Sequence, residues 1–425
     1  MLDIQIIRNQ TENVVKSLAA KGVPEQAVLD ILDLDQKRRE RQSECDTMKK
    51  DRNERSREIG ERVKKGEDVS AVKEEMRRLS DRIKVLDEEL REIEERQQAL
   101  LLMVPNMPHS GVPVGKSETD NLVSGEWGTK PSFDFEPGPH WEIGEKLGVL
   151  DLPRATRISG AGFTMLRAGL AKLERALISW MIDVHVKEHG YTEIAPPYLV
   201  NRATMTGTGQ LPKMEEDMYR CDMDDLFLIP TAEVPVTNIH SGEILGGALL
   251  PVYYVAQTPC FRREAGSYGK DTRGMTRVHQ FMKVELVKFV LPETSYDELE
   301  RLRRNAEEIL RRLGLHYRVV QLCTGDLSFS AAKCYDLEVW APGMQKYLEV
   351  SSCSNFEDFQ ARRAGIRFRR EEGAKTEFVH TLNGSGLALP RTMIALLETY
   401  QTADGNVVIP EALRPWYGAD RLIKG

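Results

Sequence analysis

The feature that most constrains the fold is a long, charge-rich stretch, residues 31–102, which contains no proline and little glycine. In its second half the apolar residues follow alternating steps of four and three, the heptad pattern of a coiled coil. This seam consists of Val72, Met76, Leu79, Ile83, Leu86, Leu90, Ile93 and Leu100. Between the halves, Gly66 is placed to end one helix, and Asp68 or Ser70 to cap the next. Because a short turn folds the chain back on itself, the stretch predicts an antiparallel two-helix coiled-coil arm.

The first half continues the same steps with a seam that is half basic, which includes Arg38, Arg41, Arg52 and Arg55. Two interpretations of the basic residues remain open. They form ion pairs with interspersed Glu and Asp residues, as on most charge-rich helices. Alternatively, some of them follow the phosphate backbone of a nucleic acid.

Length, charge and cysteine usage limit the class of protein. At 425 residues the chain is long enough for two domains. Its net charge of −7 argues against indiscriminate nucleic-acid binding but permits a local basic surface. Six cysteines without a C-x-x-C pair argue against a disulfide framework or a zinc site. The first residues lack an export signal, and the longest apolar run is shorter than the roughly 20 residues of a spanning helix. We therefore expect a soluble, cytoplasmic protein with no membrane partner.

The proline-rich stretch at residues 104–113 breaks the helix and begins a new unit. We place the boundary there, with an N-terminal domain at 1–108 and a larger body at 109–425. In the body, hairpin-linked strands with helices set apart predict an α+β fold, an antiparallel β-sheet flanked by helices. No P-loop or Rossmann glycine motif is present, so neither kind of nucleotide site is supported.

The apolar patterns of the body predict its elements. An amphipathic helix carries Leu166, Leu170, Leu173, Leu177, Trp180 and Val184 on one stripe. Two prolines in residues 190–200 predict an edge or interface strand. Further strands are expected at 226–229, 252–258, 281–290, 317–322, 332–340 and 347–352, and helices at 296–313 and 391–401.

Residues 261–285, FRREAGSYGKDTRGMTRVHQFMKVE, predict a hairpin with a long, glycine-rich and basic tip. Arg262 and Glu264 on one arm, and Phe281 and Glu285 on the other, are separated by even numbers, so alternation places each pair on a shared face. A guanidinium, an aromatic ring and two carboxylates suit an anionic, planar ligand with an amine, such as a nucleotide plus an amino acid. The alternative is a solvated hairpin with incidental charges.

Three stretches together resemble the signature motifs of class II aminoacyl-tRNA synthetases. The first is matched by Gly190, Tyr191, Ile194, Pro197, Tyr198 and Leu199, the second by Phe261, Arg262, Glu264, Arg277, Phe281 and Glu285, and the third by Gly384, Gly386 and Arg391. Pro390 departs from the third motif, and a helix start tolerates it. Each motif alone is weak, whereas three in order with similar spacing are very specific.

The whole chain resembles the bacterial, zinc-free seryl-tRNA synthetases. The resemblance is carried by the helical arm, by Thr231-Ala232-Glu233, by residues 349–352 (EVSS) and by residues 381–386 (TLNGSG). The archaeal subgroup with a zinc site is disfavoured, because no Cys/His cluster accompanies residues 231–233. The resemblance implies a homodimer that activates L-serine with ATP and Mg²⁺ and charges the 3′ end of tRNA(Ser), with tRNA(Sec) as an open second substrate.

The implied chemistry needs no protein nucleophile, because the serine carboxylate attacks the α-phosphate and a tRNA hydroxyl then takes the seryl group. Catalysis is therefore positioning and charge neutralisation. Arg262 and Arg391 are the expected catalytic residues, with Arg262 bridging the serine carboxylate and the α-phosphate. Residues 265–276 are expected to be mobile and to close over ATP.

The resemblance also divides the site residues by ligand. Serine is expected to contact Thr231, Glu233, Arg262, Glu285, Asn383 and Ser385. ATP is expected to contact Arg262, Arg263, Glu264, Arg277, Val278, Phe281, Glu349, Val350, Ser351, Ser352 and Arg391. Adenine is expected to stack between Phe281 and Arg391, with Glu264 and the Val278 backbone at its edge, and Arg277 is expected to reach the γ-phosphate. Mg²⁺ is expected on Glu349 and Ser352, and tRNA on Arg38, Arg41, Arg52 and Arg55.

Two other functions remain as alternatives. A paralogue with the same body could form an adenylate without tRNA or charge a carrier protein, although such proteins usually lack the long arm. A non-catalytic RNA-binding or regulatory protein would be expected to lose Arg262, Glu285 or Arg391, and all three are present.

Overall fold

The computed structural model describes residues 1–265 and 273–425. They form two compact units, Met1–Pro105 and Asn106–Gly425. This division lies close to the domain boundary that the sequence places after residue 108. None of the described helices is both long and apolar enough to cross a membrane.

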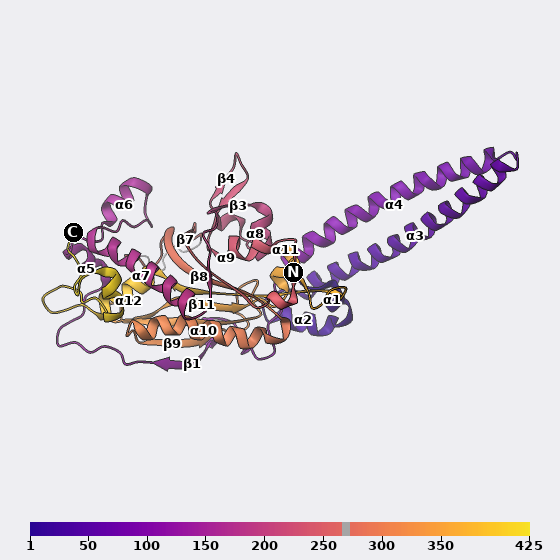
Figure 1. Ribbon diagram of the computed structural model, residues 1–425. Coiled ribbons are helices and arrows are strands. Elements are labelled where there is room, and N and C mark those ends of the chain that lie inside the picture. The colour runs from indigo at the N-terminus through magenta and orange to yellow at the C-terminus, as the bar shows by residue number, and fades with distance from the viewer. Residues whose placement is uncertain (266–272) are drawn as a thin grey trace. The chain divides into compact units, whose positions relative to one another are not determined.

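The N-terminal unit consists of helices joined by short turns. Helices α1 (Ile4–Asn9) and α2 (Thr11–Ala19) precede two long helices, α3 (Glu25–Lys64) and α4 (Ser70–Met103), which run antiparallel (Figure 1). Gly66 turns the chain with a φ of +75°, and the Asp68 carboxylate accepts a hydrogen bond from the Ser70 backbone N–H at 2.9 Å. Cys45, Ile83, Leu86 and Leu90 are buried between the helices. The predicted coiled-coil arm is confirmed.

The C-terminal unit is built on an eight-stranded sheet in the order β1-β9-β10-β11-β14-β8-β7-β2. Its strands are β1 (Leu122–Trp127), β2 (Thr192–Glu193), β7 (Val252–Phe261), β8 (Gln280–Val290), β9 (Tyr317–Gln321), β10 (Lys333–Ala341), β11 (Lys346–Asn355) and β14 (His380–Ala388). All neighbours pair antiparallel except β2, which lies parallel to β7 at one edge. The predicted α+β class is confirmed.

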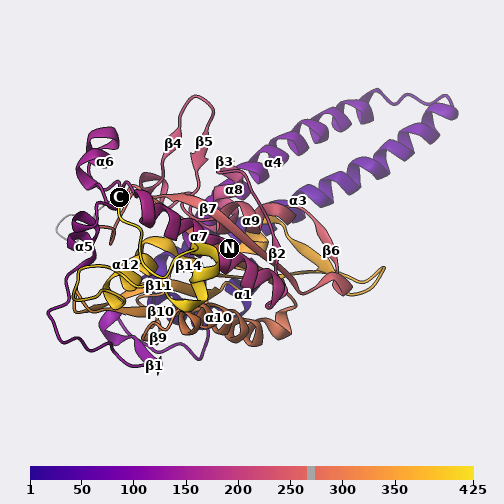
Figure 2. The same cartoon turned by 60° about the vertical axis from the view of Figure 1, so that its left-hand side comes forward.

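Two three-stranded sheets, β13-β12-β6 and β3-β5-β4, accompany the large one. Their strands are β3 (Leu199–Asn201), β4 (Arg220–Cys221), β5 (Leu226–Leu228), β6 (Ile244–Gly246), β12 (Arg367–Arg369) and β13 (Thr376–Phe378). Figure 2 shows the hairpin of β4 and β5 standing out from the large sheet. The strand predicted at 190–200 is divided between β2 and β3, because Pro196 and Pro197 lie between them and cannot donate to a ladder.

Helices pack around the large sheet. They are α5 (His140–Lys146), α6 (Leu152–Ser159), α7 (Ala168–Lys187), α8 (Arg202–Thr208), α9 (Glu233–Thr237), α10 (Ser295–Arg312), α11 (Phe359–Ala364), α12 (Leu389–Thr399) and α13 (Arg414–Tyr417). The predicted stripe lies in the main core from Leu170 onward, where Leu170, Leu173 and Leu177 are buried, whereas Leu166 precedes α7 and packs against that core. Burying such side chains contributes roughly 1.5 to 3 kcal/mol each.

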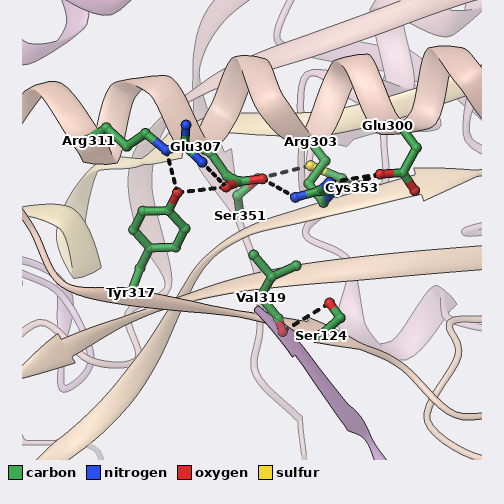
Figure 3. A network of polar contacts seen from close by, with 9 residues as sticks. All are labelled: Ser124, Glu300, Arg303, Glu307, Arg311, Tyr317, Val319, Ser351 and Cys353. Atoms are coloured by element: carbon green, nitrogen blue, oxygen red, sulfur yellow. Dashed lines mark hydrogen bonds and ion pairs between the residues drawn. The ribbon is translucent and has the colours of Figure 1, made fainter. Parts of the chain in front are cut away.

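Helix α10 is fixed to one face of the sheet by polar as well as apolar contacts (Figure 3). The buried Glu307 carboxylate accepts from the Tyr317 hydroxyl of β9 at 2.6 Å and from Arg311 at 3.0 Å. On β14, a side chain at Gly384 would meet Leu302 of α10 and Cys353 of β11. Because side chains alternate along a strand, the residues on either side of Gly384 face away from α10. That opposite face carries the site.

Candidate active site

A cavity of about 450 Å³ lies against β8, β11 and β14, between the segment after β7, the residues before α9 and the start of α12. All the residues predicted to bind serine line it. So do all the residues predicted to bind ATP, with the exceptions of Arg263 and Ser351. Side chains separated by as many as 160 residues in sequence thus meet in one place, as Thr231 and Arg391 do.

Strand alternation builds one wall of the cavity. Phe281, Lys283 and Glu285 alternate along β8 and share one face, and Asn383 and Ser385 do the same on β14. The two strands pair with Ser385 opposite Glu285. The sequence prediction for this arm of the hairpin therefore agrees with the structure.

The alternation predicted for the other arm is wrong. Arg262 and Glu264 lie beyond the end of β7 at Phe261, and Glu264 has a φ of +51°, in the left-handed region. The Arg262 Nε donates to the Pro230 carbonyl at 3.3 Å, and its guanidinium carbon lies 5.3 Å from the centre of the Phe281 ring. A turn, not a strand face, brings both side chains to the cavity.

One end of the cavity holds a cluster of buried polar side chains. The Lys283 ammonium donates to Thr231 Oγ1 at 2.8 Å and pairs with Glu285 Oε2, to which Thr231 Oγ1 donates at 3.2 Å. The Glu233 carboxylate accepts from Gln360 Nε2 at 2.6 Å. Burial, together with the negative charge of Glu285, raises the pKa of Glu233 to about 7. Two carboxylates and a hydroxyl suit a small ligand with an ammonium and a hydroxyl group.

The other end is rich in arginine. Arg391, at the start of α12, donates from Nη1 to the Glu349 carbonyl at 2.9 Å and from Nε to the Thr276 carbonyl at 3.3 Å. Arg277 Nη1 donates to Glu264 Oε2 at 3.0 Å. Arg277 and Arg262 provide forked donors for the oxygens of a polyphosphate, and the planar Arg391 guanidinium suits the face of an aromatic base.

Two predicted ATP residues point elsewhere. Figure 3 places Ser351 beside Cys353 on the side of the sheet covered by α10, and its hydroxyl donates to the Ser385 carbonyl at 2.6 Å. Its neighbour Ser352 faces the cavity because alternate residues of β11 face opposite sides. The Arg263 guanidinium lies 6.0 Å from the Tyr219 ring, outside the cavity lining.

The predicted magnesium ligands, Glu349 and Ser352, both line the cavity. Within residues 1–265 and 273–425, no group of three or more His, Cys, Asp or Glu residues is arranged to hold a metal. Mg²⁺ does not require one, since it keeps several waters and is usually held by one or two carboxylates plus substrate phosphates. An exposed carboxylate beside a hydroxyl, in a cavity that also holds phosphate-binding arginines, fits that donor set.

Sequence reasoning missed some residues of the cavity. Lys283 could have been predicted from the sequence, since it lies between Phe281 and Glu285 on the alternating strand. Gln210 and Phe329 line the cavity from distant loops and carry no local signal. The predicted mobile segment, 265–276, falls mainly on residues 266–272, which lie outside the described residues.

The arginines predicted to bind tRNA lie on α3, and three of the four are ion-paired. Arg38 contacts Asp35 at 3.7 Å, and Arg55 contacts Glu75 of α4. Arg41 contacts Glu44 and Glu89 at 3.0 and 3.1 Å. The ion-pair interpretation thus holds for these three, and it does not exclude a contact with tRNA.

Comparison with known proteins places the chain. The model of the seryl-tRNA synthetase N-terminal domain matches residues 1–108, and that of the tRNA synthetase class II core domain (G, H, P, S and T) matches residues 217–400. The serine–tRNA ligase of Geobacter sulfurreducens is 57% identical over 98% of this chain and 99% of its own length. The chain belongs to the seryl-tRNA synthetase family. A second serine–tRNA ligase, from Geobacillus sp., is 58% identical over 100% of both chains.

Solved structures agree with this seryl-tRNA synthetase assignment. The seryl-tRNA synthetase of Pyrococcus horikoshii, complexed with ATP, superposes over 100% of both chains with a TM-score of 0.95 and 39% identity. The cytoplasmic serine–tRNA ligase of Naegleria fowleri, in complex with AMP, gives a TM-score of 0.88 and 30% identity over 100% of this chain and 99% of its own. A Giardia lamblia prolyl-tRNA synthetase, 16% identical over 64% of this chain, shares the fold alone.

Proposed function

We propose that the chain activates L-serine with ATP to seryl-adenylate and transfers the seryl group to the 3′ end of tRNA(Ser). The observation that carries the proposal is a single cavity with two chemically different ends. Thr231, Glu233 and Glu285 lie at one end and Arg277 and Arg391 at the other, while Arg262 donates to the Pro230 carbonyl next to Thr231. An amino acid and a nucleotide fit such a cavity side by side.

The geometry supports a mechanism based on positioning. Glu233 holds the serine ammonium, with Thr231 beside it, and Glu285, with Asn383 and Ser385, holds the hydroxyl. Arg262 lies between the two ends, where its forked donors neutralise both the serine carboxylate and the charge that develops at the α-phosphate. Phe281 stacks on adenine with Arg391 on the other face. Glu349 and Ser352 would hold Mg²⁺, which supplies further neutralisation of the phosphates.

The wider setting is part of the proposal. Tyr198 and Leu199, in the first class II motif, are 44% and 45% exposed, and β2 of the same motif is an edge strand of the large sheet, which supports a homodimer that covers this motif. All six cysteines are free, and none of the described helices could span a membrane, which supports a reducing, cytoplasmic location. The coiled-coil arm is the surface proposed to bind tRNA.

Serine-dependent exchange of pyrophosphate into ATP tests the proposal, with charging of a tRNA(Ser) transcript measured in parallel. The full-length chain is expected to catalyse both, and the same charging assay with tRNA(Sec) decides the second substrate. Exchange without charging would support the carrier-type paralogue, and neither activity would support a non-catalytic protein. Deleting residues 35–93 is expected to leave exchange within about threefold and to abolish charging, because the arm makes the sequence-independent contacts. Charging that survived would refute the role of the arm.

A further inference from the structure

Lys283 is the one charged residue of the described cavity lining to which the preceding assignments give no ligand. It lies on β8 between Phe281 and Glu285, and its side chain is 8% exposed. A lysine is rarely buried unless it is paired, because removing the ammonium from water is costly. Its partners are Glu285 Oε2 and Thr231 Oγ1, which belong to the two residues assigned to the hydroxyl and the ammonium of serine.

The hydrogen bonds around Thr231 form a directed chain. The Thr231 hydroxyl accepts from the Lys283 ammonium at 2.8 Å and from the Glu233 backbone N–H at 3.1 Å, and it donates to Glu285 Oε2 at 3.2 Å. A hydroxyl has one proton and two lone pairs, so these three bonds use all of its capacity. Lys283 therefore fixes the direction in which the Thr231 proton points.

Both contacts to the Glu285 carboxylate are made to the same oxygen, Oε2. Among the described residues, none makes a polar contact with the other oxygen, Oε1. Two contacts to one oxygen restrict the rotation of the carboxylate and leave the second oxygen available as an acceptor. That acceptor is of the type that a substrate hydroxyl needs and that an alanine methyl group cannot use.

Lys283 also supplies a positive charge beside two nearby carboxylates. Glu233 and Glu285 share a buried site, and two nearby carboxylates disfavour each other's ionised forms. The other charged or ionisable groups that bear on Glu285 are Arg262, which lines the same cavity, and the Cys260 and Cys353 thiols. None of these three groups forms an ion pair with the Glu285 carboxylate, whereas Lys283 does. Without it, Glu285 would be a buried anion held only by a hydroxyl.

We propose that Lys283 is a positioning residue that holds the Glu285 carboxylate oriented toward the hydroxyl of the amino acid, and thereby sets the preference for serine over alanine. The inference rests on the proposed function and deepens it. Lys283 itself does not touch the reacting atoms. Its effect reaches the substrate through Glu285, the residue assigned to the hydroxyl that alanine lacks.

A matched control lies on the same strand. Lys288 is fully buried, and its ammonium donates to Glu298 Oε2 at 2.8 Å. It is five residues from Lys283, so alternation places it on the other face of β8, and it does not line the cavity. Lys288→Met therefore removes a comparable buried ion pair without changing the serine end of the cavity.

The experiment compares serine- and alanine-dependent pyrophosphate exchange in full-length Lys283→Met, Lys283→Arg, Lys288→Met and the unmodified chain, with kcat and KM resolved for each. Lys283→Met is expected to lower kcat/KM for serine about 100-fold, mainly through KM, and to change that for alanine less than about threefold. Lys283→Arg, which keeps the charge, is expected to recover most of the preference. Lys288→Met is expected to keep the serine-to-alanine ratio within about twofold even where its melting temperature falls.

A serine-to-alanine ratio of kcat/KM that is unchanged in Lys283→Met would overturn the inference. Equal losses for both amino acids would show a structural role only, and no loss for either would show no role. Should Lys283→Met not fold, Lys283→Gln decides, because the amide can still donate a hydrogen bond but carries no charge. It is expected to lower the ratio at least about tenfold. Absence of serine-dependent exchange in the unmodified chain would instead refute the proposed function.

Discussion

Arg277 donates to the Glu264 carboxylate across 3.0 Å, and both side chains line the same cavity. The resemblance assigns Glu264 to the adenine edge and Arg277 to the γ-phosphate, which are opposite ends of ATP. The two residues therefore cannot make both assigned contacts while they remain paired. Binding of ATP must replace the ion pair with two separate contacts.

Replacing Glu264 with alanine tests which contribution is larger. The change removes an acceptor at the adenine edge, which is worth about 1.5 to 3 kcal/mol for a charged hydrogen bond. It also releases Arg277 from an ion pair whose partners are 33% and 20% exposed, which is worth at most about 1 kcal/mol. The loss is larger, so the KM for ATP is expected to rise about tenfold in pyrophosphate exchange, while the KM for serine stays within about twofold. A lower KM for ATP would mean that the ion pair inhibits binding.

Arg262→Lys keeps the positive charge at position 262 and removes the planar guanidinium group with its parallel N–H donors. A lysine cannot bridge two anionic groups with parallel donors, and it also loses the bond from Nε to the Pro230 carbonyl. We expect kcat for serine-dependent exchange to fall about 100- to 1000-fold, equivalent to roughly 3 to 4 kcal/mol of transition-state stabilisation. The control is Arg370→Lys, on an exposed arginine paired with Glu293 and Glu377, which should leave exchange unchanged. Full activity in Arg262→Lys would contradict the mechanism.

Glu233 combines a functional and a destabilising role. Its pKa is raised to about 7 by burial and by Glu285. A carboxyl group with a raised folded pKa favours folding while it is protonated, so its contribution falls as pH rises from about 4.5 to about 7 and stays low above that range. In the substrate-free protein, Glu233→Gln should therefore raise the free energy of unfolding at pH 8 by on the order of 2 kcal/mol and change it little at pH 4.5.

The same substitution should weaken serine recognition, because the substrate ammonium loses its anionic partner. The KM for serine is expected to rise about 100-fold at pH 8. In the unmodified chain, kcat/KM for serine should fall about tenfold per pH unit below about 7, as Glu233 becomes protonated. Urea unfolding at the two pH values and a pH profile of exchange check both parts. A stability difference that is equal at pH 4.5 and pH 8 would show that ionisation of Glu233 is not its source.

Local patterns predicted most elements of this fold. The heptad of α4, the stripe of α7 and the alternation of β8 each reflect burial on one side of one element, which the sequence records directly. Local patterns could not predict which distant segments of the chain come together. The positive φ of Glu264 and the placement of Gln210 and Phe329 depend on packing between segments far apart in the chain. The family resemblance predicts that Ser351 contacts ATP. Its side chain instead points toward α10, because alternate residues of β11 face opposite sides of the sheet.

The arginines of the arm provide the last prediction, because their surroundings differ. Arg38, Arg41 and Arg55 are paired with carboxylates, whereas Arg52 forms no ion pair with any described residue and only influences Asp87 through its charge. A phosphate that contacts a paired arginine must compete with that carboxylate. Arg52→Ala is therefore expected to weaken tRNA binding about fivefold and to reduce the salt-dependence slope by about 1, and Arg41→Ala to have a smaller effect. Pyrophosphate exchange should not change in either variant.

Filter binding of a tRNA(Ser) transcript across a salt series measures this effect, with Arg91→Ala as the control. Arg91 lies on α4, is exposed and contacts Glu88 at 2.8 Å, so it resembles the paired arginines of α3 but is not one of the predicted contacts. Because each lost phosphate contact lowers the slope, a slope that is equal in all three variants would show that these side chains bind no phosphate. A larger loss in Arg41→Ala than in Arg52→Ala would show instead that tRNA displaces the ion pairs of the arm at little cost, as weak exposed pairs allow.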